Sequence, residues 1–410
     1  MKPYAYIPTL YIYEAIPYSI VMTTSVLMYQ QLGISTASYA FWTSLLYLPW
    51  TIKPLWSPIV ESIGTKRKWI VSTQILIAIL FAIMGIALRC DAFYAISLIG
   101  LALIAFTSAS HDIACDGFYI LALNEKEQSY YVGIRSTFYR LGTMAAIGLM
   151  PIIVGYMGGY TDNPWSASFI ILGITLAVLA VTNGIMMPMP TDKTASKNSI
   201  SIYGDVIRSF FSKPGAVSAI AFMLLFRLGE AQLAKIATPF LVDATENGGI
   251  GLTETQYGIL YGTAGVIALT LGGILGGFAA GKWGLKRSIW PMTLSMNIPN
   301  IAYIIIAQLQ PAADSISVIA AVIVEQFGYG FGFCAYMLFL IEYVRDSKYK
   351  TAEYALATAI MAIGMMIPGM ISGWAFDQMH QSYELFFIYV LACCIPGMAL
   401  IPLIKKQIRE

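Results

Sequence analysis

The sequence has few charged residues: Asp, Glu, Lys and Arg make up 11% of its 410 residues, whereas hydrophobic residues make up 58%. Soluble domains carry about 25% charged residues, so this composition excludes an ordinary soluble protein. Apolar segments of about 20 residues, the length that crosses a bilayer, fill nearly the whole chain and leave no room for a soluble domain. The net charge of +2 gives no indication of a nucleic-acid partner. We therefore expect an all-α integral membrane protein.

Cysteine and histidine are also scarce, with five and two residues. The cysteines are odd in number, form no CxxC motif and lie in or at the ends of apolar segments, so we interpret them as packing residues. No Ser-His-Asp set or phosphate-binding loop stands out. The first apolar segment is long and carries Glu14, which argues against a cleavable signal peptide. We expect neither an enzyme nor a bound metal or cofactor.

Twelve apolar segments are long enough to cross a hydrocarbon core of about 30 Å. They cover residues 7–31, 39–60, 69–89, 93–123, 131–157, 167–187, 215–241, 255–280, 289–309, 315–341, 353–376 and 384–404. Most of the 24 lysines and arginines lie in the connections on one side, whereas the other side has only Arg89. Because cytoplasmic loops are enriched in Lys and Arg, both termini are predicted to be cytoplasmic.

The longest polar connection, residues 188–214, divides the chain into six plus six spans. We expect residues 1–187 and 215–410 to form two six-helix halves, with 188–214 as a cytoplasmic linker. Landmarks recur between the halves in the same order and at a nearly constant offset: Glu14 with Glu230, Tyr39 with Tyr257, Gly64 with Gly284, Asp112 with Glu325, Tyr131 with Tyr349 and Gly148 with Gly364. Parallel six-helix pseudo-repeats around a central cavity are typical of major-facilitator-type transporters, which work by alternating access.

Two short basic turns join spans two and three and spans eight and nine. They read Gly64-Thr-Lys-Arg-Lys and Gly284-Leu-Lys-Arg. Both match that superfamily's signature loop, in which an acid, glycines and basic residues hold neighbouring helices together on the cytoplasmic side. The residues expected in this latch are Glu61, Gly64, Lys66, Arg67, Gly284, Lys286 and Arg287. The second turn has no acid, so we expect its latch to be weaker.

Several stretches resemble one family more closely, the AmpG-type muropeptide permeases. They are Leu48-Pro-Trp-Thr-Ile-Lys-Pro-Leu-Trp-Ser-Pro58, Ser110-His-Asp-Ile-Ala-Cys-Asp-Gly117, Tyr139-Arg-Leu-Gly142, Phe226-Arg-Leu-Gly-Glu-Ala231 and Ala352-Glu-Tyr-Ala-Leu356. The resemblance implies proton-driven import of GlcNAc–anhydro-MurNAc, with or without peptide, across a bacterial inner membrane. His111 stands where the family has Gln, and Glu230 where it has Asp. A simple amino sugar, another glycopeptide or an acetyl-CoA-like compound, as carried by related transporters, therefore stays an alternative substrate.

The stretch from Thr107 to Tyr119 places Asp112 and Asp116 four residues apart, so on a helix they share one face. A charge in hydrocarbon is costly, so these acids should face a bundle interior or a wet cavity. Our hypothesis is that Asp112 or Asp116 exchanges the coupling proton, with Arg140 in the next span as its switching partner. A fixed ion pair that stabilises the N-terminal half and a latch on the cytoplasmic side are the alternatives.

Other polar side chains within the spans are candidates for contact with a substrate: Glu14, Lys53, Tyr139, Arg227, Glu230, Lys235 and Glu325. The bases could hold a carboxylate such as a muramyl lactyl group, and Tyr139 could stack on a sugar. Arg227 and Glu230 are three residues apart, so a local salt bridge between them is the alternative.

A membrane enzyme is the main rival class, because His-Asp-x3-Asp could hold a divalent metal. Such enzymes need a second acid-rich cluster, and the counterpart region offers only Glu325. We therefore expect a monomeric transporter whose partners are the lipid bilayer and a small glycan or glycopeptide, with protons as the coupling ion.

Overall fold

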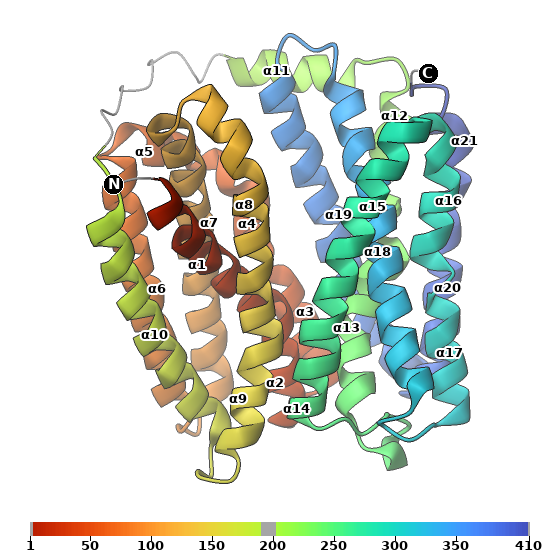
Figure 1. The fold of residues 1–410 in the computed structure, drawn as a ribbon. Helices are drawn as coiled ribbons and strands as arrows, with labels where there is room; N and C mark the ends of the chain where they lie inside the picture. Colours follow the sequence, from red (N-terminus) through yellow and green to blue (C-terminus); the bar gives the residue numbers. More distant parts are fainter. Residues whose placement is uncertain (1–2, 190–201, 409–410) are drawn as a thin grey trace. The chain divides into compact units, whose positions relative to one another are not determined.

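The computed structural model describes residues 3–189 and 202–408, and every regular element within those ranges is a helix (Figure 1). Ten helical segments in this part of the chain are long and apolar enough to cross a membrane. They are Lys66–Ala87, Phe93–Ala122, Gly133–Met157, Pro164–Met186, Ala216–Val242, Glu254–Trp283, Leu285–Leu309, Ile316–Val344, Ala352–Gln378 and Tyr383–Ile404. The predicted all-α integral membrane fold is confirmed, and the chain is a multi-pass membrane protein.

The two N-terminal spans differ from the other ten. Residues 7–31 are helical throughout, with a π-helical turn at Ile20–Thr24, but Glu14 and several tyrosines lower the hydropathy of this segment. The second span is broken into α3 (Thr36–Leu45), α4 (Leu48–Ile52), η3 (Lys53–Leu55) and α5 (Ser57–Ser62). Prolines 49, 54 and 58 explain the breaks, because proline lacks the backbone N–H that a helix interior requires. The count of twelve spans stays a prediction.

The internal contacts of the chain define two compact units. The first contains Met1–Met28, Leu46–Lys197 and Glu254–Gly262, and the second contains Tyr29–Leu45, Asn198–Thr253 and Thr263–Glu410. The halves expected at 1–187 and 215–410 stay a prediction, and residues 190–201 of the expected linker lie outside the described residues.

The first unit is a helix bundle with α1 near its centre. Its principal helices are α1 (Ile7–Ser19), α6 (Lys66–Ala87), α7 (Phe93–Ala122), α8 (Glu125–Met144), α9 (Met150–Met157) and α10 (Pro164–Met186). Helix α6 packs between α7 and α10, while α1 packs against α7 and α8 (Figure 1). Side-chain caps fix where two of these helices begin. Asn124 and Glu127 form a capping box at the start of α8, and Asn163 caps the start of α10.

The second unit is also a helix bundle. Its helices are α3, α11 (Ile202–Phe211), α12 (Ala216–Leu225), α13 (Leu228–Val242), α15 (Val266–Trp283), α16 (Leu285–Asn297), α17 (Asn300–Leu309), α18 (Ile316–Val344), α19 (Lys350–Gln378), α20 (Tyr383–Ala399) and α21 (Ile401–Ile404). Helix α18 packs against α15 and α16, while α19 packs against α3 and α13. Phe226 and Tyr336 stack in its core with their ring centroids 4.9 Å apart. Helices α15 and α18 approach closely at Gly272, where an added Cβ would lie 2.9 Å from the backbone nitrogen of Phe331. Large side chains such as Trp283 and Phe278 stay exposed, as expected for surfaces that face lipid.

Candidate functional site

A glycine sets the distance between α1 and α8 in the first unit. A Cβ added at Gly142 would lie 2.5 Å from the carbonyl oxygen of Ile12 and 2.8 Å from the Cβ of Ala15. Only a residue without a side chain allows this approach. Glu14 lies on the same stretch of α1, so the contact brings its carboxyl group next to the side chains that α8 carries one and two turns earlier.

Both aspartates of the 107–119 stretch are ion-paired. The ammonium group of Lys53 donates to Asp112, and Arg135 Nη2 donates to Asp116 Oδ1 at 2.6 Å. Lys53 reaches Asp112 from η3, the short element that the proline breaks produce. Lys53 is therefore an ion-pair partner here, in addition to its predicted role as a substrate contact.

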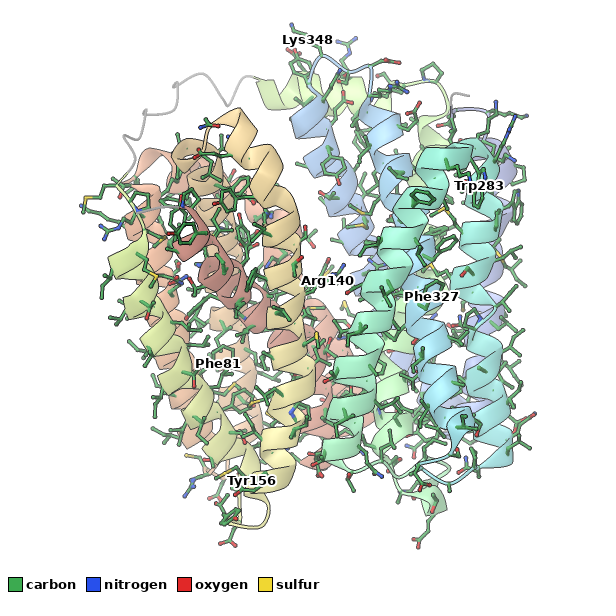
Figure 2. All side chains as sticks on the ribbon, in the orientation of Figure 1. Phe81, Arg140, Tyr156, Trp283, Phe327 and Lys348 are labelled. Carbon is green, nitrogen blue, oxygen red and sulfur yellow. The ribbon has the colours of Figure 1, made fainter. Side chains whose placement is uncertain are left out.

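Arg135 takes the place beside Asp116 that the sequence suggested for Arg140. Its guanidinium carbon lies 4.5 Å from the ring centroid of Tyr11 and 5.4 Å from that of Tyr119, so two aromatic faces also stabilise the cation. Arg140 is exposed and projects from α8 (Figure 2). In the described part of the chain it has no ion-pair partner. Its predicted role as a switching partner stays a prediction.

Glu14 is the third carboxyl group of this cluster. It is 6% exposed, and its Oε2 atom has no hydrogen-bond partner among the described residues. The group interacts electrostatically with Asp112, Asp116 and Arg135. A cavity of about 250 Å³ opens beside it, lined by Glu14, Arg135, Ser136, Tyr139 and Arg140. Three of the predicted site residues, Glu14, Tyr139 and Arg140, therefore share one cavity.

A buried chain of hydrogen bonds runs behind the acids. Thr9 donates to Asn183 at 2.6 Å, the Asn183 amide donates to Gln74 at 3.2 Å, and Gln74 Nε2 lies 3.0 Å from His111 Nε2. Tyr13 donates to the backbone carbonyl of Gln74 at 2.6 Å. The network joins α1, α6, α7 and α10, and it places the histidine that precedes Asp112 in the interior rather than on the cavity.

The second unit has a charged cluster of its own. Arg227 Nε donates to Glu230 Oε2 at 3.0 Å, and Arg227 Nη2 donates to the hydroxyl of Tyr329 at 2.6 Å. The guanidinium carbon also lies 4.8 Å from the ring centroid of Phe333. Arg227 sits in the break between α12 and α13. The local salt bridge that the three-residue spacing allowed is thus present.

Two further candidates of the second unit are almost fully buried. Lys235 is 5% exposed and donates to the hydroxyl of Thr43 on α3 at 3.0 Å. Glu325 is also 5% exposed and accepts a hydrogen bond from Gln326 at 2.9 Å. Glu325 interacts electrostatically with Glu230, so the two acids expected to match Asp112 and Glu14 lie near each other.

Each of the two basic turns contains a glycine with a positive φ. Gly64 and Gly284 adopt φ values of +71° and +77°, which favour glycine. Lys66 is buried, donates to the carbonyl of Val60 at 3.0 Å and packs across Gly117, one residue after Asp116.

The other latch residues differ in their surroundings. Arg67 donates to the carbonyl of Gly184 on α10, so it joins α6 to a neighbouring helix. Lys286 is half-buried and Arg287 is exposed. The side chain of Glu61 lies outside the described residues.

Within the described residues, no group of three or more His, Cys, Asp or Glu side chains is arranged to hold a metal ion. Asp112 and Asp116 are instead paired with Lys53 and Arg135.

Comparisons with known proteins agree on a transporter. The sequence profile of the Major Facilitator Superfamily matches residues 9–373. The anhydromuropeptide permease of Escherichia coli K12 is 26% identical over 382 residues, which cover 90% of this chain and 72% of that protein. The putative transporter AmpG 4 of Rickettsia conorii is 21% identical over 416 residues, covering 97% and 95% of the two chains.

Solved structures share the fold. A bacterial homologue of the human lysosomal transporter Spinster, inward-facing and unoccupied, has a TM-score of 0.76 and 15% identity and covers 100% of this chain and 98% of its own. The nucleoside transporter NupG has a TM-score of 0.70 and 15% identity, covering 98% and 99%. The superfamily profile matches most of the sequence, and the permease and AmpG relatives cover 90% and 97% of it. The resemblance to the superfamily and to the AmpG-type permeases is therefore confirmed. The relatives are transporters rather than enzymes, and this chain is a small-molecule transporter that belongs to the Major Facilitator Superfamily.

Proposed function

We propose that this protein imports cell-wall anhydro-muropeptides by alternating access and that proton movement drives the import. The observation that carries the coupling is the buried cluster of Glu14, Asp112 and Asp116 beside a cavity in the first unit. Three acids share two paired cations there, Lys53 and Arg135, so the cluster has one carboxyl more than it has ion-pair partners. Binding one proton to the carboxyl group without an ion pair leaves each remaining carboxylate with its own partner, so the cluster can take up and release one proton.

The substrate class is supported by the relationship to the Escherichia coli anhydromuropeptide permease, which extends over 90% of this chain. In the second unit, Arg227 supplies a planar cation held between a carboxylate and aromatic rings. Such a group suits recognition of a substrate carboxylate. Glu230 pairs with Arg227. In this proposal Lys235 and Glu325 are further substrate contacts in the second unit, and Tyr139 supplies an aromatic face in the first unit.

We also propose that the protein is a monomer in the bacterial inner membrane, with both termini in the cytoplasm. The excess of lysine and arginine in the loops on one side supports this orientation. The native cysteines, which include exposed Cys90, are first replaced by serine. Cysteines introduced into this background at position 4 and at position 406 should react with membrane-impermeant maleimide only after the cells are opened. Labelling in intact spheroplasts would contradict the orientation.

Transport by purified protein in proteoliposomes tests the proposal. Labelled anhydro-muropeptide should accumulate when the outside is acidic, and a protonophore should abolish the accumulation. Acetyl-CoA and simple amino sugars are the competing substrates, and preferential uptake of either would replace the muropeptide. Absence of gradient-driven uptake of any of the three would refute proton-coupled import.

Arg227→Ala tests the substrate carboxylate. Because the guanidinium would contact only the acidic group, the variant should lose uptake of lactyl-containing substrates far more than uptake of neutral amino sugars. Arg345→Ala, which removes an exposed arginine of the same unit, is the control. Equal losses for acidic and neutral substrates would contradict the assignment.

A further inference from the structure

We propose that the coupling proton is carried by Glu14, and not by either aspartate of the 107–119 stretch. This inference rests on the proposed function for its role in transport. Its starting point is the distribution of cations among the three acids. Asp112 is paired with Lys53 and Asp116 with Arg135, whereas Glu14 has no ion pair among the described residues.

The burial of Glu14 makes this difference important. Glu14 is 6% exposed, whereas Asp112 and Asp116 are both partly exposed. A buried carboxylate that lacks both a counter-ion and a hydrogen bond to one of its oxygens is costly, whereas a protonated carboxyl group is neutral and can donate a hydrogen bond. Oε2 is the atom without a partner, so it is the position where a proton removes the cost.

The charged and titratable groups around Glu14 come from α7, α8, η3 and α1 itself. They are Asp112, Cys115 and Asp116 from α7, Arg135, Tyr139 and Arg140 from α8, Lys53 from η3 and Tyr11 from α1 itself. The two aspartates repel an anionic Glu14, and Arg135 attracts it. Glu14 and Asp112 also share a hydrogen bond between their carboxyl groups, which requires one of the two acids to be protonated. Arg135 already donates to Asp116, so an anionic Glu14 must compete with Asp116 for the same guanidinium group.

The cavity supplies the path for the proton. Its volume of about 250 Å³ has room for several water molecules, each of which occupies about 30 Å³ in the liquid. Glu14 is one of the residues that line it. A hydronium ion in the cavity transfers its proton to Oε2: one O–H bond forms, one breaks, and a neutral water molecule remains. Release is the reverse step, and it leaves a carboxylate that draws Arg135 away from Asp116.

The movement of Arg135 connects the proton to the helices. Its guanidinium group holds α8 to α7 through Asp116 and to α1 through the ring of Tyr11. When Glu14 is neutral, the Arg135–Asp116 pair is undisturbed. When Glu14 is charged, the arginine is shared between α1 and α7. Binding and release of one proton therefore shift the balance of contacts within the first unit.

Infrared difference spectroscopy tests the assignment without any substrate. Purified protein in lipid is titrated in a Glu325→Gln background, which removes the almost fully buried acid of the second unit. The C=O stretch of protonated carboxyl groups is followed above about pH 6, where exposed acids are ionised. We expect this band in that background alone and with Asp91→Asn, which removes an exposed acid of the same unit as Glu14. It should be lost in Glu14→Gln and should persist in Asp116→Asn and Asp112→Asn. A band that persists in Glu14→Gln would overturn the proposal.

The role in transport is tested by the ratio of uptake with and without a pH gradient. This ratio should fall to unity in Glu14→Gln and stay above unity in Glu14→Asp, which keeps a carboxyl group and covers the case in which the glutamine variant does not fold. A Glu14→Gln ratio equal to that of the wild type would refute the assignment. A wild-type ratio of unity would instead refute the proposed coupling, and the infrared titration would still decide whether Glu14 binds the proton.

Discussion

The contact between α1 and α8 gives the sharpest test of how this site is assembled. We predict that Gly142→Ala destabilises the protein, because its new Cβ would meet Ile12 and Ala15 of α1 at 2.5 and 2.8 Å and force the helices apart. Overpacking of this kind costs about 1–3 kcal/mol, which corresponds to a roughly 5- to 150-fold change in the folding equilibrium. The displacement would also separate Glu14 from Arg135.

Gly133→Ala is the matched control on the same helix, since a Cβ at Gly133 has nothing within 4 Å. Thermal unfolding of the two purified variants in detergent and gradient-driven uptake in proteoliposomes are the measurements. Gly142→Ala should melt at a lower temperature than both the control and the wild type and should transport more slowly. Equal melting temperatures and equal uptake for the two variants would show that the close approach of α1 and α8 is not required.

Three further predictions concern buried polar contacts. A double-mutant cycle on Lys53→Ala and Asp112→Ala should give an interaction energy of about 0.5–3 kcal/mol in the free energy of unfolding, because either single change leaves the other charge unpaired. Additive effects of the two changes would contradict the ion pair. Lys213→Ala should lower the free energy of unfolding by about 1.5–3 kcal/mol, because Lys213 donates to Glu353, a fully buried acid that also accepts from Ser209 and Ser347. Arg345→Ala breaks a surface pair with Glu342 and should change that free energy by about 0–1 kcal/mol in the same thermal melts. His111→Leu should lower the free energy of unfolding by about 1–3 kcal/mol, because the Gln74 amide loses its hydrogen-bond partner, and His111→Gln should lower it less. Equal melting temperatures for the two variants would contradict the hydrogen bond.

The sequence predicts the fold more completely than it predicts the pairing of charges. Length, hydropathy and the order of landmarks are local properties, and they indicate the all-α membrane fold and the acids at depth. The pair of Lys53 and Asp112 spans 59 residues and depends on where the proline breaks place η3, so no spacing rule identifies it. The choice between Arg135 and Arg140 depends on how α8 is rotated against α7, which helical periodicity alone does not fix.

Some of the missed residues did leave a signal in the sequence. Gln74 and Asn183 are single amides in otherwise apolar segments, and polar residues at membrane depth require partners. Their positions predict that each bonds to another helix, although they do not predict which one. In the sequence His111 stands out beside Asp112 and at a position where related permeases have Gln, and its hydrogen bond to Gln74 joins it to this amide network.

The Gly142 and Glu14 variants together separate the geometry of the site from its charge. If Gly142→Ala slows uptake only by moving Arg135 away from Glu14, it should not change the gradient-independent uptake of a protein that already carries Glu14→Gln and has lost its gradient response. Its cost in stability should persist in that background, because the clash with Ile12 and Ala15 does not involve the carboxyl group. Non-additive effects on coupling with additive effects on unfolding would therefore assign the proton to Glu14 and the placement of Arg135 to Gly142. Additive effects on both would mean that α8 influences transport by another route.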